Sequence, residues 1–278
     1  MKEYKVILET GIEISCFDKG ISDKTVLCIH GLGSNKKAFL KNIDELSQNK
    51  RVIAIDLPSY GTSSKGDFPS TMMFFSAVIK KFIEAMDLKN VIVCGHSMGG
   101  QISILTAINY PDLIDKLILI APAGLEIFTP DEIKRNQSYF TLDAIKNMTP
   151  AQIEFNVRLN FYNFPKEAQF MIDERIELSK SADFDFYCLT VSSAFQDMLK
   201  KPVYNFLHLI KQPVLLFFGK EDAFFPNKIL HPTTTEFLAK EASKKIKNCR
   251  LVLIENCGHF LQFEMADTFN KEVIKFLN

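Results

Sequence analysis

The hydrophobic residues divide the chain into short apolar runs separated by amphipathic or polar segments. Eight runs have the length of a strand: KVILE (5–9), EISCF (13–17), TVLCIH (25–30), RVIAID (51–56), NVIVCG (90–95), KLILIA (116–121), PVLLFFG (213–219) and RLVLIE (250–255). Runs without alternating polarity are typical of strands that are covered on both faces, as in a parallel sheet. The first two runs are joined across Thr10-Gly11, which predicts an antiparallel hairpin at the start of the sheet.

Helical patterns lie between these runs. Between the fourth and fifth runs, Ser70 and Thr71 offer N-caps to an amphipathic helix whose apolar positions recur at spacings of three and four: Phe75, Val78, Ile79, Phe82, Ile83 and Met86. The alternation of strand and helix predicts an α/β fold with right-handed crossovers, an eight-stranded, mostly parallel sheet and helices on both of its faces.

The alternation stops for one long segment. Residues 123–205 contain no convincing strand, and their short helical patterns are separated at Pro130, Pro150, Pro165 and Pro202. We therefore predict a core made of residues 1–122 and 206–278, with a helical insertion at 123–205 after the sixth strand. The insertion is rich in aromatic rings. Most of these should pack its own helices, and the rest favour an apolar substrate pocket.

Composition narrows the range of partners. Lys plus Arg equals Asp plus Glu at 33 each, so no net field would attract nucleic acid or an anionic membrane. The six cysteines are scattered singly, without the spacing of a zinc site, and no apolar run has the length of a signal sequence or a membrane span. We expect a cytoplasmic protein without metal or cofactor that acts on a small molecule; a monomer and a homodimer are both plausible.

A possible nucleophile lies in the segment CGHSMGG. Gly95-x-Ser97-x-Gly99 follows a predicted strand and precedes a predicted helix. A tight turn between a strand and a helix forces its central residue into a strained conformation and leaves room only for small neighbouring residues. The N-terminus of the helix favours negative charge beside the serine hydroxyl. The pattern therefore predicts that Ser97 is a nucleophile.

A serine hydroxyl requires a base and a group that orients the base. His259 follows the last predicted strand, where catalytic groups of open α/β sheets lie, whereas His208 and His231 are expected to be structural or on the surface. Asp222 follows the seventh strand and completes the order serine, acid, histidine. Its neighbour Glu221 competes for this role but is expected to be a solvated charge beside a lysine.

The tetrahedral intermediate that forms when a serine attacks a carbonyl requires N–H donors for its oxyanion. Met98, directly after the nucleophile, should supply one, and Leu32 in the segment HGLGS the other, because Gly31 and Gly33 allow the sharp turn that aims its N–H. His30 should brace this loop through hydrogen bonds.

The segments HGLGS, DLPSYGTSS, GHSMGG, GKEDAFFP and GHFLQFE together resemble the α/β-hydrolase fold superfamily over essentially the whole chain. The resemblance implies a Ser97, Asp222, His259 triad and identifies the insertion as a helical cap over the active site. One departure is Ser59, where the family usually has a glycine in a loop that is not catalytic.

Within the superfamily, serine as the nucleophile argues against the haloalkane dehalogenases, which use aspartate. The segments FMIDERIELSK and FQDMLKKPVYNFLHLIKQPVLLFFGKED resemble the meta-cleavage-product hydrolases, which split carbon–carbon bonds; there Arg175 would bind a substrate carboxylate. Those enzymes usually carry Asn and Trp where this chain has His96 and Phe260, and their oxyanion loop also differs. These departures favour a carboxylesterase-like enzyme in which Arg175 forms a salt bridge within the cap.

The leading hypothesis is therefore hydrolysis of small to medium apolar esters through an acyl-enzyme. Carbon–carbon hydrolysis of a dienoic keto acid, acyl transfer, and a receptor or scaffold that has lost catalysis are the alternatives. Residues that neighbour the predicted machinery are expected to contact the substrate: Gly31, His96, Arg175 and Phe260.

Overall fold

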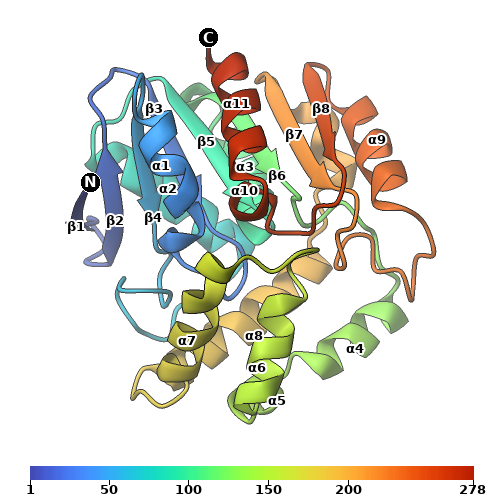
Figure 1. Ribbon diagram of the computed structural model, residues 1–278. Coiled ribbons are helices and arrows are strands. Elements are labelled where there is room, and N and C mark those ends of the chain that lie inside the picture. The colour runs from blue at the N-terminus through green and yellow to red at the C-terminus, as the bar shows by residue number, and fades with distance from the viewer.

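A single eight-stranded sheet runs through the computed structural model, which describes residues 1–278 (Figure 1). Its order is β1-β2-β4-β3-β5-β6-β7-β8. β2 is antiparallel to both β1 and β4, and all other neighbours are parallel, so the predicted mixed sheet with an N-terminal hairpin is confirmed. The strands span Lys2–Ile7 (β1), Glu13–Lys19 (β2), Thr25–Ile29 (β3), Arg51–Ile55 (β4), Val91–His96 (β5), Ile114–Ile120 (β6), Val214–Gly219 (β7) and Cys249–Ile254 (β8).

The first strand begins three residues earlier than its apolar run. Leu8 is already part of the hairpin turn, where its N–H donates to the carbonyl of Ile12 and its own carbonyl accepts from the N–H of Gly11. Gly11 has a φ of +81°, which a side chain would disfavour. The turn chemistry therefore fixes the register of the hairpin, with Ile7 opposite Glu13.

Helices cover both faces of the sheet. Contacts join α1 with α11 and α2 with α3. The predicted helix after β4 is α2, and Thr71 is its N-cap, with the hydroxyl accepting the N–H of Phe74. The α-helices span Leu40–Leu46 (α1), Met72–Ala85 (α2), Met98–Asn109 (α3), Pro130–Tyr139 (α4), Leu142–Lys146 (α5), Pro150–Arg158 (α6), Gln169–Leu178 (α7), Phe184–Lys200 (α8), Thr235–Lys245 (α9), Leu261–Glu264 (α10) and Ala266–Leu277 (α11).

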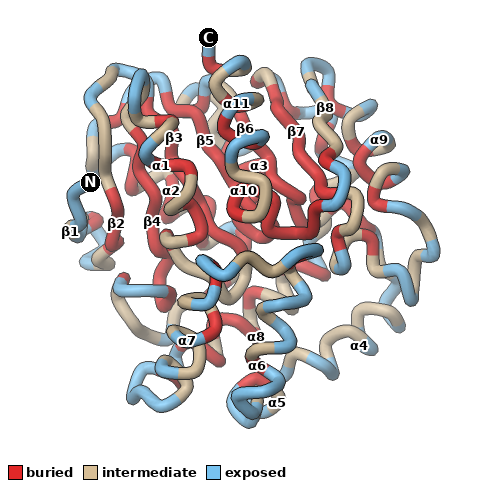
Figure 2. The backbone as a smooth tube through the Cα atoms, in the orientation of Figure 1, coloured by how far each residue is buried: buried red, intermediate tan, exposed pale blue.

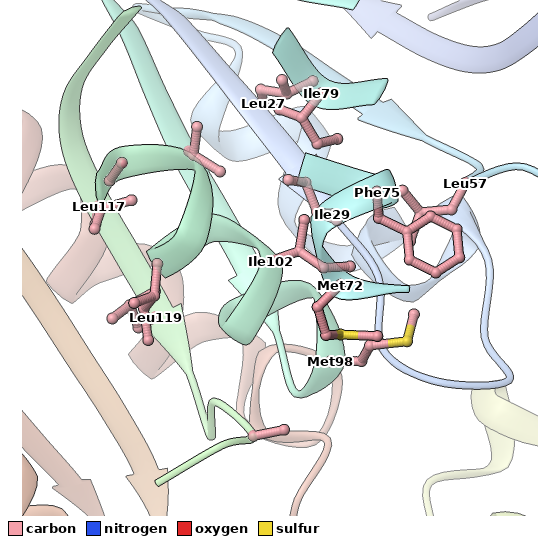
Figure 3. Close-up of a cluster of buried hydrophobic side chains, with 14 of the residues drawn as sticks. Leu27, Ile29, Leu57, Met72, Phe75, Ile79, Met98, Ile102, Leu117 and Leu119 are labelled. Atoms are coloured by element: carbon pink, nitrogen blue, oxygen red, sulfur yellow. The ribbon is translucent and has the colours of Figure 1, made fainter. Parts of the chain in front are cut away.

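Two hydrophobic cores lie on opposite faces of the sheet because alternate side chains of each strand point to opposite sides. In β3, Leu27 and Ile29 belong to the core beneath α2 and α3, where Figure 3 shows them beside Ile79 and Ile102. Val26 and Cys28 of the same strand belong to the second core, with α1 and α11. The six inner strands, β2 to β7, are therefore buried along most of their length, as Figure 2 shows in red, whereas the edge strands β1 and β8 are partly exposed.

The segment between β6 and β7 is helical, with α4 to α8 lying together at the end of the sheet toward which the parallel strands point (Figure 1). Pro130 and Pro150 are first residues of helices, a position that needs no N–H donor. Thr129 and Thr149 cap these two helices through reciprocal hydrogen bonds with the residue three positions on. None of the helices is long and apolar enough to cross a membrane.

Candidate active site

Ser97 occupies a strained turn between β5 and α3, with φ of +54° and ψ of −117°. A Cβ atom at Gly95 would overlap the carbonyl oxygen of Gly99, and one at Gly99 would overlap that of Ile29. Glycine is therefore required on both sides of the serine. The hydroxyl of Ser97 lies at the start of α3 and lines a cavity, although the residue as a whole is only 8% exposed.

His259 and Asp222 form a buried hydrogen-bonded pair. Nδ1 of His259 donates to Oδ2 of Asp222 at 2.7 Å, and Oδ1 of Asp222 accepts the N–H groups of Phe224 at 2.7 Å and Phe225 at 3.1 Å. These bonds fix the orientation of the carboxylate and the tautomer of the imidazole. His259 lines the same cavity as Ser97. No hydrogen bond joins the two side chains, a common state of such pairs before substrate binds.

Two N–H groups near Ser97 have no backbone acceptor. One belongs to Met98, the first residue of α3, and the other to Leu32 in the loop after β3. The turn at Leu32 is shaped by Gly33, whose φ is +68°. His30 braces it as expected: Nδ1 donates to the carbonyl of Gly31 at 2.8 Å, and Nε2 accepts the N–H of Leu57 at 3.1 Å.

Polar contacts that the sequence did not reveal hold the loop that carries His259. Oε2 of Glu264 accepts the N–H of Gly258 at 2.8 Å, and Oε1 accepts that of Asn163 in the insertion at 2.6 Å. Glu221 is not simply a solvated charge, because its Oε2 accepts the N–H of Cys257 at 2.9 Å. Both carboxylates therefore fix backbone near the histidine.

Gly31 and His96 lie beside the cavity and not among its lining residues. The ring of His96 is buried under those of His259 and Phe260, and its Nε2 donates to the carbonyl of His259 at 3.0 Å. Burial lowers the pKa of His96 well below its usual value, so the ring is neutral near pH 7. His96 therefore supports the histidine loop and does not make the expected contact with the substrate cavity.

The cavity above Ser97 has a volume of about 330 Å³, and 15 of its 25 lining residues are hydrophobic. The insertion contributes aromatic rings to it from three of its segments: Phe128, Phe140, Tyr187 and Phe195. A second, more polar cavity of about 570 Å³ adjoins it and shares Leu32, Gly33 and Arg175 with it; Phe260 lines only this second cavity.

Arg175 forms no salt bridge, contrary to the expectation favoured by the sequence. Its guanidinium stacks over the ring of Tyr187, 4.7 Å from the centroid, and lies beside Gly33 at the boundary of the two cavities. The preceding residue on α7, Glu174, pairs with Lys37 instead. On α7, the carboxylate of Glu174 is therefore paired with Lys37, and the guanidinium of Arg175 has no anionic partner.

Glu126, in the segment that leads from β6 into the insertion, lines the main cavity and is 8% exposed. Its Oε1 accepts the N–H of Asn227 at 2.9 Å and the Nδ1–H of His231 at 2.8 Å. Sequence reasoning missed this group, since its partners are about a hundred residues away. Its position in the segment that follows a central strand was the one available signal.

The fold and this site together define a hydrolase of the α/β type. The sequence profile of the alpha/beta hydrolase fold matches residues 24–266, and the chain belongs to that family.

Named relatives carry several activities within this family. A 2-hydroxy-6-oxononadienedioate/2-hydroxy-6-oxononatrienedioate hydrolase of Escherichia coli is 29% identical over 276 residues, covering 94% of this chain and 89% of the relative. Human monoacylglycerol lipase ABHD6 is 26% identical, covering 91% and 75%. Among solved structures, an esterase from Exiguobacterium antarcticum superimposes with a TM-score of 0.84 at 21% identity, covering 99% of each chain. The last similarity concerns the fold alone.

Proposed function

We propose that this protein is a serine hydrolase that cleaves carboxylic esters of small to medium size through an acyl-enzyme, with Ser97, His259 and Asp222 as its triad. One observation carries the proposal. The Ser97 hydroxyl and the histidine of a buried Asp222–His259 pair line one largely apolar cavity, and two N–H groups without backbone acceptors flank the serine.

The chemistry follows from this arrangement. His259 Nε2 accepts the proton of Ser97 as Oγ attacks the ester carbonyl, and the N–H groups of Leu32 and Met98 stabilise the oxyanion. The protonated His259, whose charge Asp222 stabilises, then gives its proton to the departing alkoxide. Water activated by His259 releases the acid from the acyl-enzyme. Each step uses groups of this chain, and no cofactor takes part in it.

Nitrophenyl esters of increasing acyl length test this proposal. Wild-type protein should hydrolyse them, and Ser97→Ala should lower kcat/KM by at least about a thousandfold. Glu221→Gln is a matched control, because it changes a neighbouring carboxylate that bonds to Cys257 and not to His259. Equal turnover by wild type and Ser97→Ala would exclude the serine mechanism. A fluorophosphonate should label wild type and fail to label Ser97→Ala.

Carbon–carbon bond hydrolysis of a dienoic keto acid is the second candidate. The guanidinium of Arg175 favours it, because this group has no anionic partner and lies at the cavity boundary beside the Leu32 loop. Arginine suits bidentate carboxylate binding. The names of the Escherichia coli relatives point to such substrates for those proteins.

The two candidates differ in how they depend on Arg175. If the carbon–carbon reaction is the natural one, loss of the dienoate absorbance should be fast, and Arg175→Gln should raise KM for that substrate far more than for a neutral nitrophenyl ester. If ester cleavage is the natural reaction, kcat/KM should be higher for the ester, and Arg175→Gln should affect both substrates alike. Lys37→Gln, which removes a cation already paired with Glu174, is the matched control.

A further inference from the structure

Glu126 has one carboxylate oxygen that the protein leaves unpaired. Oε1 accepts two hydrogen bonds, from Asn227 and His231, but Oε2 accepts none and is not fully buried. Because Glu126 is almost buried and lines the main cavity, a carboxylate oxygen is available there to a ligand. Asn136 and Asn227 line the same part of the cavity and are joined by a hydrogen bond of 3.3 Å.

The sheet order places this carboxylate on the opposite side of Ser97 from Arg175. Arg175 lies beside Gly33, which follows β3, and Glu126 bonds to Asn227, which follows β7. The order β3-β5-β6-β7 puts Ser97, after β5, between them. Neighbouring strands lie roughly 5 Å apart, so the ends of β3 and β7 are separated by roughly 15 Å. The cavity is therefore cationic at one end and acidic at the other.

The surroundings of Glu126 favour a ligand that donates a hydrogen bond. Burial raises the pKa of its carboxyl group, the carboxylate of Asp222 adds to this effect, and the bonds from His231 and Asn227 oppose it. A nearly buried carboxylate oxygen without a donor is costly, whereas a donor placed against it stabilises the charged form. A second carboxylate placed there would instead meet a like charge.

We infer that the β7 end of the cavity binds a hydroxyl or ammonium group of the substrate through Glu126 Oε2. This inference rests on the proposed function, which places the scissile carbonyl at Ser97, and it adds the substrate class: esters with a hydrogen-bond donor on the arm that extends toward β7. The distance from β5 to β7 is about 10 Å. An extended chain of six carbons covers roughly 7 Å, and a terminal hydrogen bond spans the remainder.

Binding to Ser97→Ala protein tests the inference without turnover. Calorimetry should compare ethyl heptanoate with ethyl 6-hydroxyhexanoate, ethyl 6-aminohexanoate and monoethyl adipate, and a second series should carry the same end groups on the alcohol arm. In one series the hydroxyl or ammonium ester should bind about 10- to 100-fold more tightly than the methyl ester, and the carboxylate ester most weakly.

Two substitutions assign the effect to Glu126. Glu126→Gln should remove the advantage of an ammonium ester and keep part of that of a hydroxyl ester, because the amide oxygen still accepts, so this variant distinguishes the two donors. Glu132→Gln is the matched control. The Glu132 carboxylate lies 3.7 Å from Nε2 of His231 and does not line the cavity, so its loss should change the affinity ratios between end groups by less than about twofold.

Equal affinities for all end groups in both series would overturn the inference, as would equal changes of the ratios in Glu126→Gln and Glu132→Gln. The comparison of end groups needs no substitution at Glu126, so it remains decisive if Glu126→Gln fails to fold. Failure of the proposed function would show separately, as equal ester turnover by wild type and Ser97→Ala.

Discussion

Substitution of Gly31 by alanine should impair catalysis while leaving the fold intact. A Cβ atom at this position would lie 2.9 Å from Nδ1 of His96 and 3.0 Å from Cβ of Ser97, whereas ordinary contacts begin at 3.4 Å. Gly31 does not have a positive φ, so alanine causes no backbone strain by itself. The His96 ring packs against the rings of His259 and Phe260 and is hydrogen-bonded to the carbonyl of His259, so turning it away would break these contacts. The loop that carries Leu32 must therefore move.

The size of the effect follows from that movement. The loop has to retreat by about 0.5 Å to restore contact distance. One oxyanion donor contributes a factor of roughly 10² to 10³, and a displacement of about 1 Å can cost a factor of about 10². We therefore expect kcat/KM for nitrophenyl butanoate to fall by about 10- to 100-fold, which corresponds to roughly 1.4 to 2.7 kcal/mol of transition-state stabilisation.

The assay compares steady-state kinetics with thermal unfolding. Tm should change by no more than about 2 °C, since only the short contact of the new Cβ atom with His96 and Ser97 has to be relieved. Gly66→Ala is the matched control, because its nearest contact is the tip of the Phe68 ring at 3.2 Å, and it should retain wild-type kinetics. Unchanged kcat/KM in Gly31→Ala would show that Leu32 does not supply an oxyanion donor. A large loss of Tm would show that Gly31 serves the fold.

Three further outcomes are expected. Asp222→Asn should lower kcat by up to about 10⁴-fold in ester hydrolysis, because an amide no longer fixes the imidazole tautomer, whereas Glu221→Gln should change it less than about tenfold. Glu264→Gln should lower the free energy of unfolding by about 1–3 kcal/mol in urea titrations, since at least one of the three N–H groups accepted by its carboxylate then faces an amide N–H; an unchanged midpoint would contradict this. Burial lowers the pKa values of His30 and His96, so below pH 6.5 the unfolded chain binds more protons than the folded one. The free energy of unfolding should therefore decrease as the pH is lowered below 6.5, by up to about 1.4 kcal/mol per pH unit for each ring. Urea unfolding at pH 7.0 and 5.5 should show this loss, and His96→Asn should reduce it.

Much of the fold could be predicted because its signals are local. An apolar run without alternation needs two covered faces, and the six inner strands have them; the first and last runs also contribute strands, but these lie at the edges of the sheet and are partly exposed. Thr71 caps α2 within three residues of itself, and the glycines around Ser97 are required by a turn only a few residues long. The pairing of Asp222 with His259 was also predicted, since both positions follow neighbouring strands whose ends meet at one edge of the sheet.

What only the tertiary structure decided is where charges from distant segments meet. Arg175 was expected to find a carboxylate in the insertion, but the neighbouring Glu174 pairs with Lys37, 137 residues away in sequence, and the guanidinium is left at the cavity. Glu126 obtains its partners from 101 and 105 residues further along the chain. The periodicity of a sequence determines which face of an element is buried, because that depends on neighbours a few residues away. Which charged groups become partners depends on how whole elements are packed, and in this protein that packing leaves a free cation and a half-paired carboxylate on opposite sides of Ser97.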